Sequence, residues 1–276
     1  IPGDLICTDS IGPFRPQRGG FFYLQIFLDI CSNKAWVYKN FTTNQKESLE
    51  NIRELDQELY NRTGRHVQVL RCDNGSEYDN TAVRGYCKAN GITLQFCVPY
   101  RKGQNGHAER YNRTLTEGGL AQLSQSGLSY DFLFDSCLHY AFTRNRTPAG
   151  GNDPSFGIRS PDERYYATRQ APIQFLPFGC LVRPTTPPSL RVKHEVRTEE
   201  AILLGYRLMS KGGYLIYRPS TKTVVIRDEV NPEPDVFPGI VNAGDFVLND
   251  DHEDEPLYLY NDDDIPFLYD TDLKEE

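Results

Sequence analysis

The order of strand-like and helix-like segments constrains this chain most, because few folds accommodate it in the first 148 residues. Three runs rich in Phe, Tyr, Ile, Leu and Val come first, and helix-like and strand-like runs then alternate. We expect strands at 3–9, 21–29, 34–39, 66–71 and 92–97, and helices at 43–61, 80–89, 107–124 and 129–145. Antiparallel strands followed by crossover units predict a mixed sheet with helices on its faces. Thr43 is the expected N-cap of the first helix.

Three acidic residues fall where such a sheet would bring their side chains together. Asp9 ends the first strand, Asp73 follows the fourth, and Glu109 lies in the first turn of the third helix. Strand ends and helix N-termini commonly build sites at one edge of α/β sheets. Carboxylates suit Mg²⁺ or Mn²⁺, and two ions about 3.5–4 Å apart clamp the attacking and leaving oxygens in phosphodiester chemistry. The sequence therefore predicts catalytic and metal-ligating roles for these three acids, with two ions per site.

Each acid also has an ordinary structural interpretation that the sequence leaves open. Asp9 could cap a turn, and Asp73 could accept a hydrogen bond within an Asx-turn. Glu109 could pair with Arg113 one helical turn away. Asp29 ends a strand as well, but the hairpin turn that follows it favours a structural role.

The polar loop at residues 99–106 has the composition of a phosphate-binding segment, since it combines cations, amides and glycines. Two further cations follow on one flank of the third helix. The alternative is an ordinary solvated loop. The residues expected to contact DNA on these grounds are Arg101, Lys102, Gln104, Asn105, Arg110 and Arg113.

The second half of the chain changes composition twice. A stretch rich in Gly, Pro, Asp and Arg predicts a linker with one or two helical turns, and four short β-type runs then predict a small barrel. An acidic, aromatic tail follows, which we expect to be disordered. The expected domains are a core at 1–148, a linker at 149–171, a β domain at 172–230 and a tail at 231–276.

Charge is distributed unevenly along the chain. Residues 1–227 carry 29 Lys and Arg against 21 acids, whereas residues 228–276 carry 17 acids and one Lys. A basic body favours a polyanionic partner. Apolar stretches break within about ten residues, short of the ~20 that a membrane span needs, so no membrane partner is expected. The seven cysteines lack metal-site spacing and predict reduced thiols in an intracellular protein.

Several motifs resemble those of copia-type LTR retrotransposon integrases. In the core they are Thr8-Asp9, the hairpin at 28–38, and residues 73–77 and 104–114. Residues 178–181, 203–206 and 211–214 resemble the SH3-like segment that follows that core in copia-type polyproteins. The absence of an initial Met fits a piece of a longer polyprotein.

The resemblance implies an RNase H-like fold, followed by an SH3-like barrel, and a DDE polynucleotidyl transferase that joins 3′ ends of element cDNA to target DNA. The family's catalytic acids correspond to Asp9, Asp73 and Glu109. Its polar contacts correspond more loosely to four further residues of this chain. These are Gln104, Asn105, Asn112 and Arg113.

The same resemblance implies a homo-oligomer that acts in the nucleus, after synthesis in the cytoplasm and carriage in virus-like particles. The acidic tail is expected to be a spacer, with docking on a protein or competition with DNA as alternatives. A nuclease of the same fold and a catalytically silent domesticated DNA-binding module are competing functions.

Overall fold

The computed structural model contains two compact units, each described here by itself. The first comprises residues 1–117 and 140–173, and the second comprises residues 118–139 and 174–276. Helices α3 (Gly106–Ser126) and α4 (Leu133–Arg146) contribute residues to both units. The described residues are 1–97, 106–148, 159–168, 174–185, 199–207 and 213–241.

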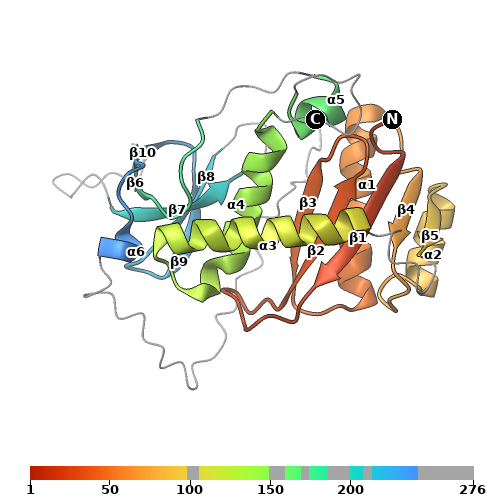
Figure 1. Cartoon of the computed structure of the whole chain (residues 1–276), viewed down its shortest axis with the longest axis horizontal. Coiled ribbons are helices and arrows are strands. Elements are labelled where there is room, and N and C mark those ends of the chain that lie inside the picture. Colours follow the sequence, from red (N-terminus) through yellow and green to blue (C-terminus); the bar gives the residue numbers. More distant parts are fainter. Residues whose placement is uncertain (98–105, 149–158, 169–173, 186–198, 208–212, 242–276) are drawn as a thin grey trace, which may run out of the picture. The chain divides into compact units, whose positions relative to one another are not determined.

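The first unit is built on a mixed five-stranded sheet (Figure 1). Its strands are β1 (Leu5–Ile11), β2 (Tyr23–Asp29), β3 (Ala35–Asn40), β4 (Val69–Cys72) and β5 (Thr93–Phe96). They lie in the order β3-β2-β1-β4-β5, with β1, β2 and β3 antiparallel and β4 parallel to both β1 and β5. The expected RNase H-like mixed sheet is confirmed.

Helix α1 (Gln45–Thr63) forms because its apolar residues recur at helical spacing and bury one face. Its core side chains are Leu49, Ile52, Leu55 and Leu59. The N-cap is Asn44, whose Oδ1 accepts hydrogen bonds of 2.9 Å from the N–H groups of Lys46 and Glu47. The predicted cap at Thr43 was wrong by one residue, because either side chain can cap a helix and only geometry selects between them.

Asp29 has the structural role that the sequence favoured. Its side chain is fully buried at the end of β2. It accepts hydrogen bonds from Gly3 N (2.8 Å), Ser32 N (2.7 Å) and Ser32 Oγ (2.6 Å). These bonds hold the β2–β3 turn and the start of the chain, and they balance the cost of burying the carboxylate.

Two more helices belong to the first unit. Helix α2 (Thr81–Ala89) is capped by Asn80, and α5 (Pro161–Tyr166) by a capping box of Ser160 and Glu163. Helix α5 supplies the helical turns expected in the linker. Its Asp162 is fully buried and pairs with Lys34 at 2.7 Å. Residues 149–158 and 169–173 of the expected linker lie outside the described residues.

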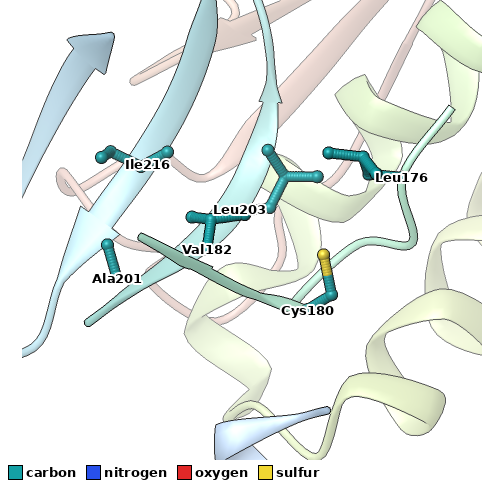
Figure 2. Close-up of a cluster of buried hydrophobic side chains, with 6 residues drawn as sticks. All are labelled: Leu176, Cys180, Val182, Ala201, Leu203 and Ile216. Carbon is teal, nitrogen blue, oxygen red and sulfur yellow. The ribbon is translucent and has the colours of Figure 1, made fainter. Parts of the chain in front are cut away.

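The second unit contains an antiparallel sheet in the order β10-β6-β7-β8-β9. Its strands are β6 (Leu181–Pro184), β7 (Ala201–Tyr206), β8 (Tyr214–Arg218), β9 (Thr223–Arg227) and β10 (Val230–Glu233). Short helices η1 (Tyr130–Phe132) and α6 (Pro238–Val241) accompany it. Figure 2 shows a buried cluster beneath this sheet, made of Leu176, Cys180, Val182, Ala201, Leu203 and Ile216.

This sheet continues past residue 230, where the sequence placed the start of the tail. Strand β10 pairs with β6 in a register that sets Val230 beside Pro184 and Glu233 beside Leu181. The strand contains Asn231 and Pro232, so its sequence lacks the alternation of apolar residues that would predict a strand. Residues 242–276, the rest of the expected tail, lie outside the described residues.

All seven cysteines are free thiols, and five of them are buried. None of the helices in the described ranges is both long and apolar enough to cross a membrane.

His139 is a buried histidine of the second unit. It is 2% exposed, its Nε2 donates to the carbonyl oxygen of Leu176 at 3.1 Å, and its ring contacts those of Phe178 and Tyr206. Burial lowers the pKa of His139 from 6.5 to about 4. The folded unit therefore holds this imidazole neutral.

We expect His139 to make the second unit less stable in acid. Between pH 6.5 and pH 4 the unfolded chain binds this proton and the folded chain does not, so the free energy of unfolding falls as pH drops. The expected loss is about 3 kcal/mol relative to His139→Asn. Hydrogen exchange of β7 amides from pH 7 to pH 4 measures it. Equal pH dependence in both proteins would contradict the assignment.

Candidate active site

Asp9 lies on β1 and faces the first turns of α3. Its Oδ2 accepts a hydrogen bond of 2.8 Å from Asn112 Nδ2, and its Oδ1 accepts one of 3.0 Å from Ser10 N. Because side chains alternate along a strand, Thr8 and Ser10 point to the opposite face. Figure 1 shows α1 and α3 on opposite faces of this sheet. Asp9 is thus fixed on the α3 face by two donors.

The electrostatics of Asp9 indicate where the other two acids lie. Burial, the nearby Asp73 carboxylate and, to a smaller extent, the Glu109 carboxylate together raise the pKa of Asp9 to about 6. The hydrogen bonds from Ser10 and Asn112 oppose this by favouring the charged form. Three carboxylates, far apart in the sequence, therefore act on one another in the folded chain.

Asp73 follows β4 at the same edge of the sheet. Strands β1 and β4 run parallel, with Cys7 opposite Arg71, and two more residues in that register lead to Asp9 and Asp73. Asp73 Oδ1 also accepts a hydrogen bond of 3.0 Å from Gly75 N. This hydrogen bond is the Asx-turn contact that the sequence left open as a structural role for Asp73. It orients the carboxylate as the chain turns away from the strand.

Glu109 lies in the first turn of α3, on an exposed part of the helix. It precedes Asn112 by three residues, and residues at that spacing share a helix face. Since Asn112 bonds to Asp9, Glu109 faces the same region. Arg113 pairs with Glu117 at 2.8 Å, so the suggested Glu109–Arg113 ion pair is not formed.

A buried hydroxyl network behind Asp9 escaped the sequence analysis. Tyr78 is fully buried, and its hydroxyl lies 3.2 Å from Thr8 Oγ1, 3.1 Å from Ser10 Oγ and 3.2 Å from Gln25 Nε2, which donates to it. Gln25 Oε1 accepts a bond of 2.7 Å from Asn51 of α1. The network joins the loop that carries Asp73 to the two residues that flank Asp9.

Removing the Tyr78 hydroxyl should impair this arrangement. We expect Tyr78→Phe to destabilise the first unit by about 1–3 kcal/mol, because it removes the buried hydroxyl to which Gln25 Nε2 donates. DNA affinity should be unchanged, while the joining rate at saturating DNA falls. Tyr165→Phe is the control, since the hydroxyl of that buried residue has no hydrogen-bond partner within the described residues. Equal joining rates in both variants would show a purely structural role.

The residues expected to contact DNA differ in their exposure to solvent. Arg110 and Arg113 are exposed on α3, whereas Asn112 is 6% exposed and its amide is bonded to Asp9. Asn112 therefore holds a carboxylate instead of facing solvent. Arg101, Lys102, Gln104 and Asn105 lie outside the described residues.

The three acids fit divalent cations by chemistry and electrostatics. Within the described ranges, no three His, Cys, Asp or Glu side chains stand close enough to hold a metal ion as they are. Carboxylates repel one another when ionised, and this repulsion adds to burial, the larger cause, in raising the pKa of Asp9. Hard cations prefer such oxygen ligands and would offset that repulsion.

Comparison with known families agrees with this geometry. The model described as "Integrase core domain" matches residues 1–102, which include Asp9 and Asp73. The model described as "Retroviral polymerase SH3-like domain" matches residues 180–243, which include all of β6 to β10. The expected SH3-like β domain is confirmed.

Curated relatives are retrotransposon polyproteins. The Pol polyprotein from transposon TNT 1-94 of Nicotiana tabacum is 30% identical over 236 residues, covering 84% of this chain and 17% of the relative. That from transposon RE1 of Arabidopsis thaliana is 26% identical over 238 residues, covering 86% and 16%. The Ty1-LR3 Gag-Pol polyprotein of Saccharomyces cerevisiae is 26% identical over 231 residues, covering 81% and 12%.

The chain thus spans 17% or less of the length of these three relatives. Its two matched regions follow the order that the sequence motifs predicted, core first and SH3-like segment second. The chain therefore contains an integrase core domain followed by a retroviral polymerase SH3-like domain, and it is similar to copia-type retrotransposon Pol polyproteins.

Proposed function

We propose that this chain is a DDE-type polynucleotidyl transferase that joins 3′ ends of linear element cDNA to target DNA. The observation that supports the proposal is geometric: Asn112 of α3 bonds to Asp9 at 2.8 Å, and β4, which leads to Asp73, runs parallel to β1, which carries Asp9. Three carboxylates match a reaction that needs no Ser, Cys or His nucleophile.

Asp9, Asp73 and Glu109 would hold two Mg²⁺ or Mn²⁺ ions. Bound there, such ions lower the pKa of a 3′-hydroxyl or water and stabilise the departing alkoxide. The protein's own groups position the site. Asn112 and Ser10 N hold Asp9, Gly75 N holds Asp73, and helix α3 carries Glu109 in its first turn, where the helix dipole favours an anion.

Partners and location follow from the same proposal. Two cDNA ends must join target DNA in concert, so we propose a homo-oligomer that acts in the nucleus. Arg101, Lys102, Gln104, Asn105, Arg110 and Arg113 are the proposed phosphate contacts. The acidic tail at 231–276 is proposed as a spacer whose alternative roles are docking on a protein and competing with DNA.

The structure of the DNA products tests the proposal. The full chain is incubated with Mn²⁺, blunt DNA ends and a supercoiled target, and the products are sequenced. Joined molecules with staggered attachment support strand transfer. Nicks without joining would favour a nuclease, and salt-dependent DNA binding without Mn²⁺-dependent products would favour a silent binding module.

A further inference from the structure

A second surface of the first unit combines exposed aromatic rings with cations, and it lies in the β1–β2 connection and the end of β3. Backbone hydrogen bonds define it, because Phe14 N bonds to Phe22 O at 2.8 Å and Phe22 N bonds to Asn40 O at 3.1 Å. Gly20 N closes the turn on Gln17 O at 2.8 Å. We call this surface the aromatic platform; it consists of Phe21, Lys39 and Phe41, together with Arg15 and Arg18 of the adjoining β1–β2 connection.

The rings of the platform are held in place and remain accessible. Phe21 and Phe41 stack with centroids 4.4 Å apart, and Lys39 Nζ lies 5.8 Å from the Phe21 centroid. Phe41 is 50% exposed. Its N–H donates to Glu47 Oε2 at 2.8 Å, which ties its backbone to the start of α1. Because Phe41 is half-exposed and its backbone is held in place, its ring is available to stack on a planar group such as a nucleic-acid base.

Charge around the platform favours an anion. Residues 10–46 contain five Lys and Arg and one acid, but Lys34 and Asp29 are buried at the ends of β3 and β2 opposite the platform, which leaves four cations. The nearest acid beyond them, Glu47, accepts hydrogen bonds from Phe41 N, Thr42 N and Thr42 Oγ1, so backbone and hydroxyl donors offset its charge. Cations beside exposed rings match a partner with phosphates and aromatic bases.

Sheet topology relates the platform to the carboxylates. Strand β3 runs parallel to β1, because each is antiparallel to β2, so Asn40 at its carboxyl end lies at the same edge as the end of β1. Two strand spacings separate them, about 10 Å, which about three stacked nucleotides at ~3.4 Å each would span. Along this edge, Asp73 comes first, after β4. Asp9 on β1 comes next, and the platform beside β2 and β3 comes last.

We propose that the aromatic platform binds unpaired nucleotides of the DNA strand that enters the carboxylate site. Phe41 stacks on a base, and the side chains of Arg15, Arg18 and Lys39 contact neighbouring phosphates. This inference rests on the proposed polynucleotidyl transferase activity. It adds to the carboxylate site a surface, on the β2–β3 side, that holds the DNA strand. Stacking tolerates every base, so the platform would bind strands without sequence preference.

Binding of single-stranded and duplex DNA by the full chain tests the platform. Affinities for short fluorescein-labelled strands are measured by anisotropy over a range of NaCl concentrations, without divalent ions. The variants are Phe41→Ala, Phe41→Trp and the double variant Arg15→Gln/Arg18→Gln. Tyr60→Ala is the matched control, since Tyr60 is a 44% exposed aromatic residue on the last turn of α1.

We expect Phe41→Ala to weaken single-strand binding about tenfold, and Phe41→Trp to restore it. Duplex binding should change less than about twofold, because paired bases are not free to stack. The double arginine variant should lower the slope of log affinity against log salt by about 1.4, at ~0.7 per single-strand phosphate contact. Tyr60→Ala should bind as the parent protein does.

Two results would overturn the platform. One is parental single-strand affinity in both Phe41→Ala and the arginine variant. The other is unchanged DNA affinity with a lower oligomeric mass, which would make this face a protein contact. If the parent joins DNA in either case, the proposed transferase stands without the platform. If Phe41→Ala weakens strand binding but the parent joins nothing, the platform stands and the transferase fails.

Discussion

Asp9→Asn, Asp73→Asn and Glu109→Gln should each lower DNA joining by about 100-fold or more, because each removes a charged ligand from the reacting centre. Each substitution keeps the size of the side chain and an amide able to accept hydrogen bonds. Asn is also a good Asx-turn residue, so Asp73→Asn preserves the contact to Gly75 N. The fold should therefore survive while the chemistry is lost.

The measurement is single-turnover joining of labelled ends to a plasmid, with DNA affinity determined in parallel. Glu50→Gln serves as the control, since Glu50 is an exposed carboxylate on α1. We expect the control to join at the parental rate and all four proteins to bind DNA alike. Joining within about twofold of the parent in all three variants would reject the catalytic assignment.

Asp162→Ala should destabilise the first unit by about 3–5 kcal/mol, because it leaves buried cations without their partner. Asp162 Oδ1 pairs with Lys34 Nζ at 2.7 Å, and Oδ2 pairs with Arg146 Nη1 at 3.2 Å. The side chains of Asp162 and Lys34 are 1% and 6% exposed. Lys34 Nζ also lies 4.8 Å from the centroid of the Trp36 ring, so the buried ammonium group contacts an aromatic face as well as Asp162.

Urea denaturation of the full chain, followed by the fluorescence of its single tryptophan, measures this effect. Trp36 is buried beside Lys34 and reports on the first unit directly. The control is Asp4→Ala, which removes an exposed ion pair of 2.6 Å to Arg65 and should cost less than about 1 kcal/mol. If Asp162→Ala and Asp4→Ala were equally stable, helix α5 would not be anchored by this buried cluster.

The order of elements in the first sheet could be predicted because each element carries a local signal. Apolar residues at helical spacing predict α1, and Asn80, a residue type that favours the N-cap position, indicates the start of α2. Asp9 and Asp73 were predicted as site residues because the sequence suggested a strand end at each, although β1 continues past Asp9 to Ile11. Glu109 was predicted from its place at the start of a helix, beside a polar loop.

Contacts between distant residues had no such signal. Lys34 and Asp162 meet across 128 positions, and nothing in either local sequence marks a buried ion pair. Tyr78 reads as one more aromatic residue after an Asx-turn, although its hydroxyl bonds to Thr8 and Ser10. Strand β10 was missed because backbone pairing with β6, and not an apolar pattern, makes it a strand.

Anomalous diffraction from crystals of the full chain grown with Mn²⁺ tests the central claim most directly. The account predicts two peaks ligated by carboxylate oxygens of Asp9, Asp73 and Glu109, with Asn112 still bonded to Asp9. Crystals of Asp73→Asn should lose at least one peak under the same conditions. Mn²⁺ bound only elsewhere, with these three carboxylates remaining apart at saturating metal, would contradict the account.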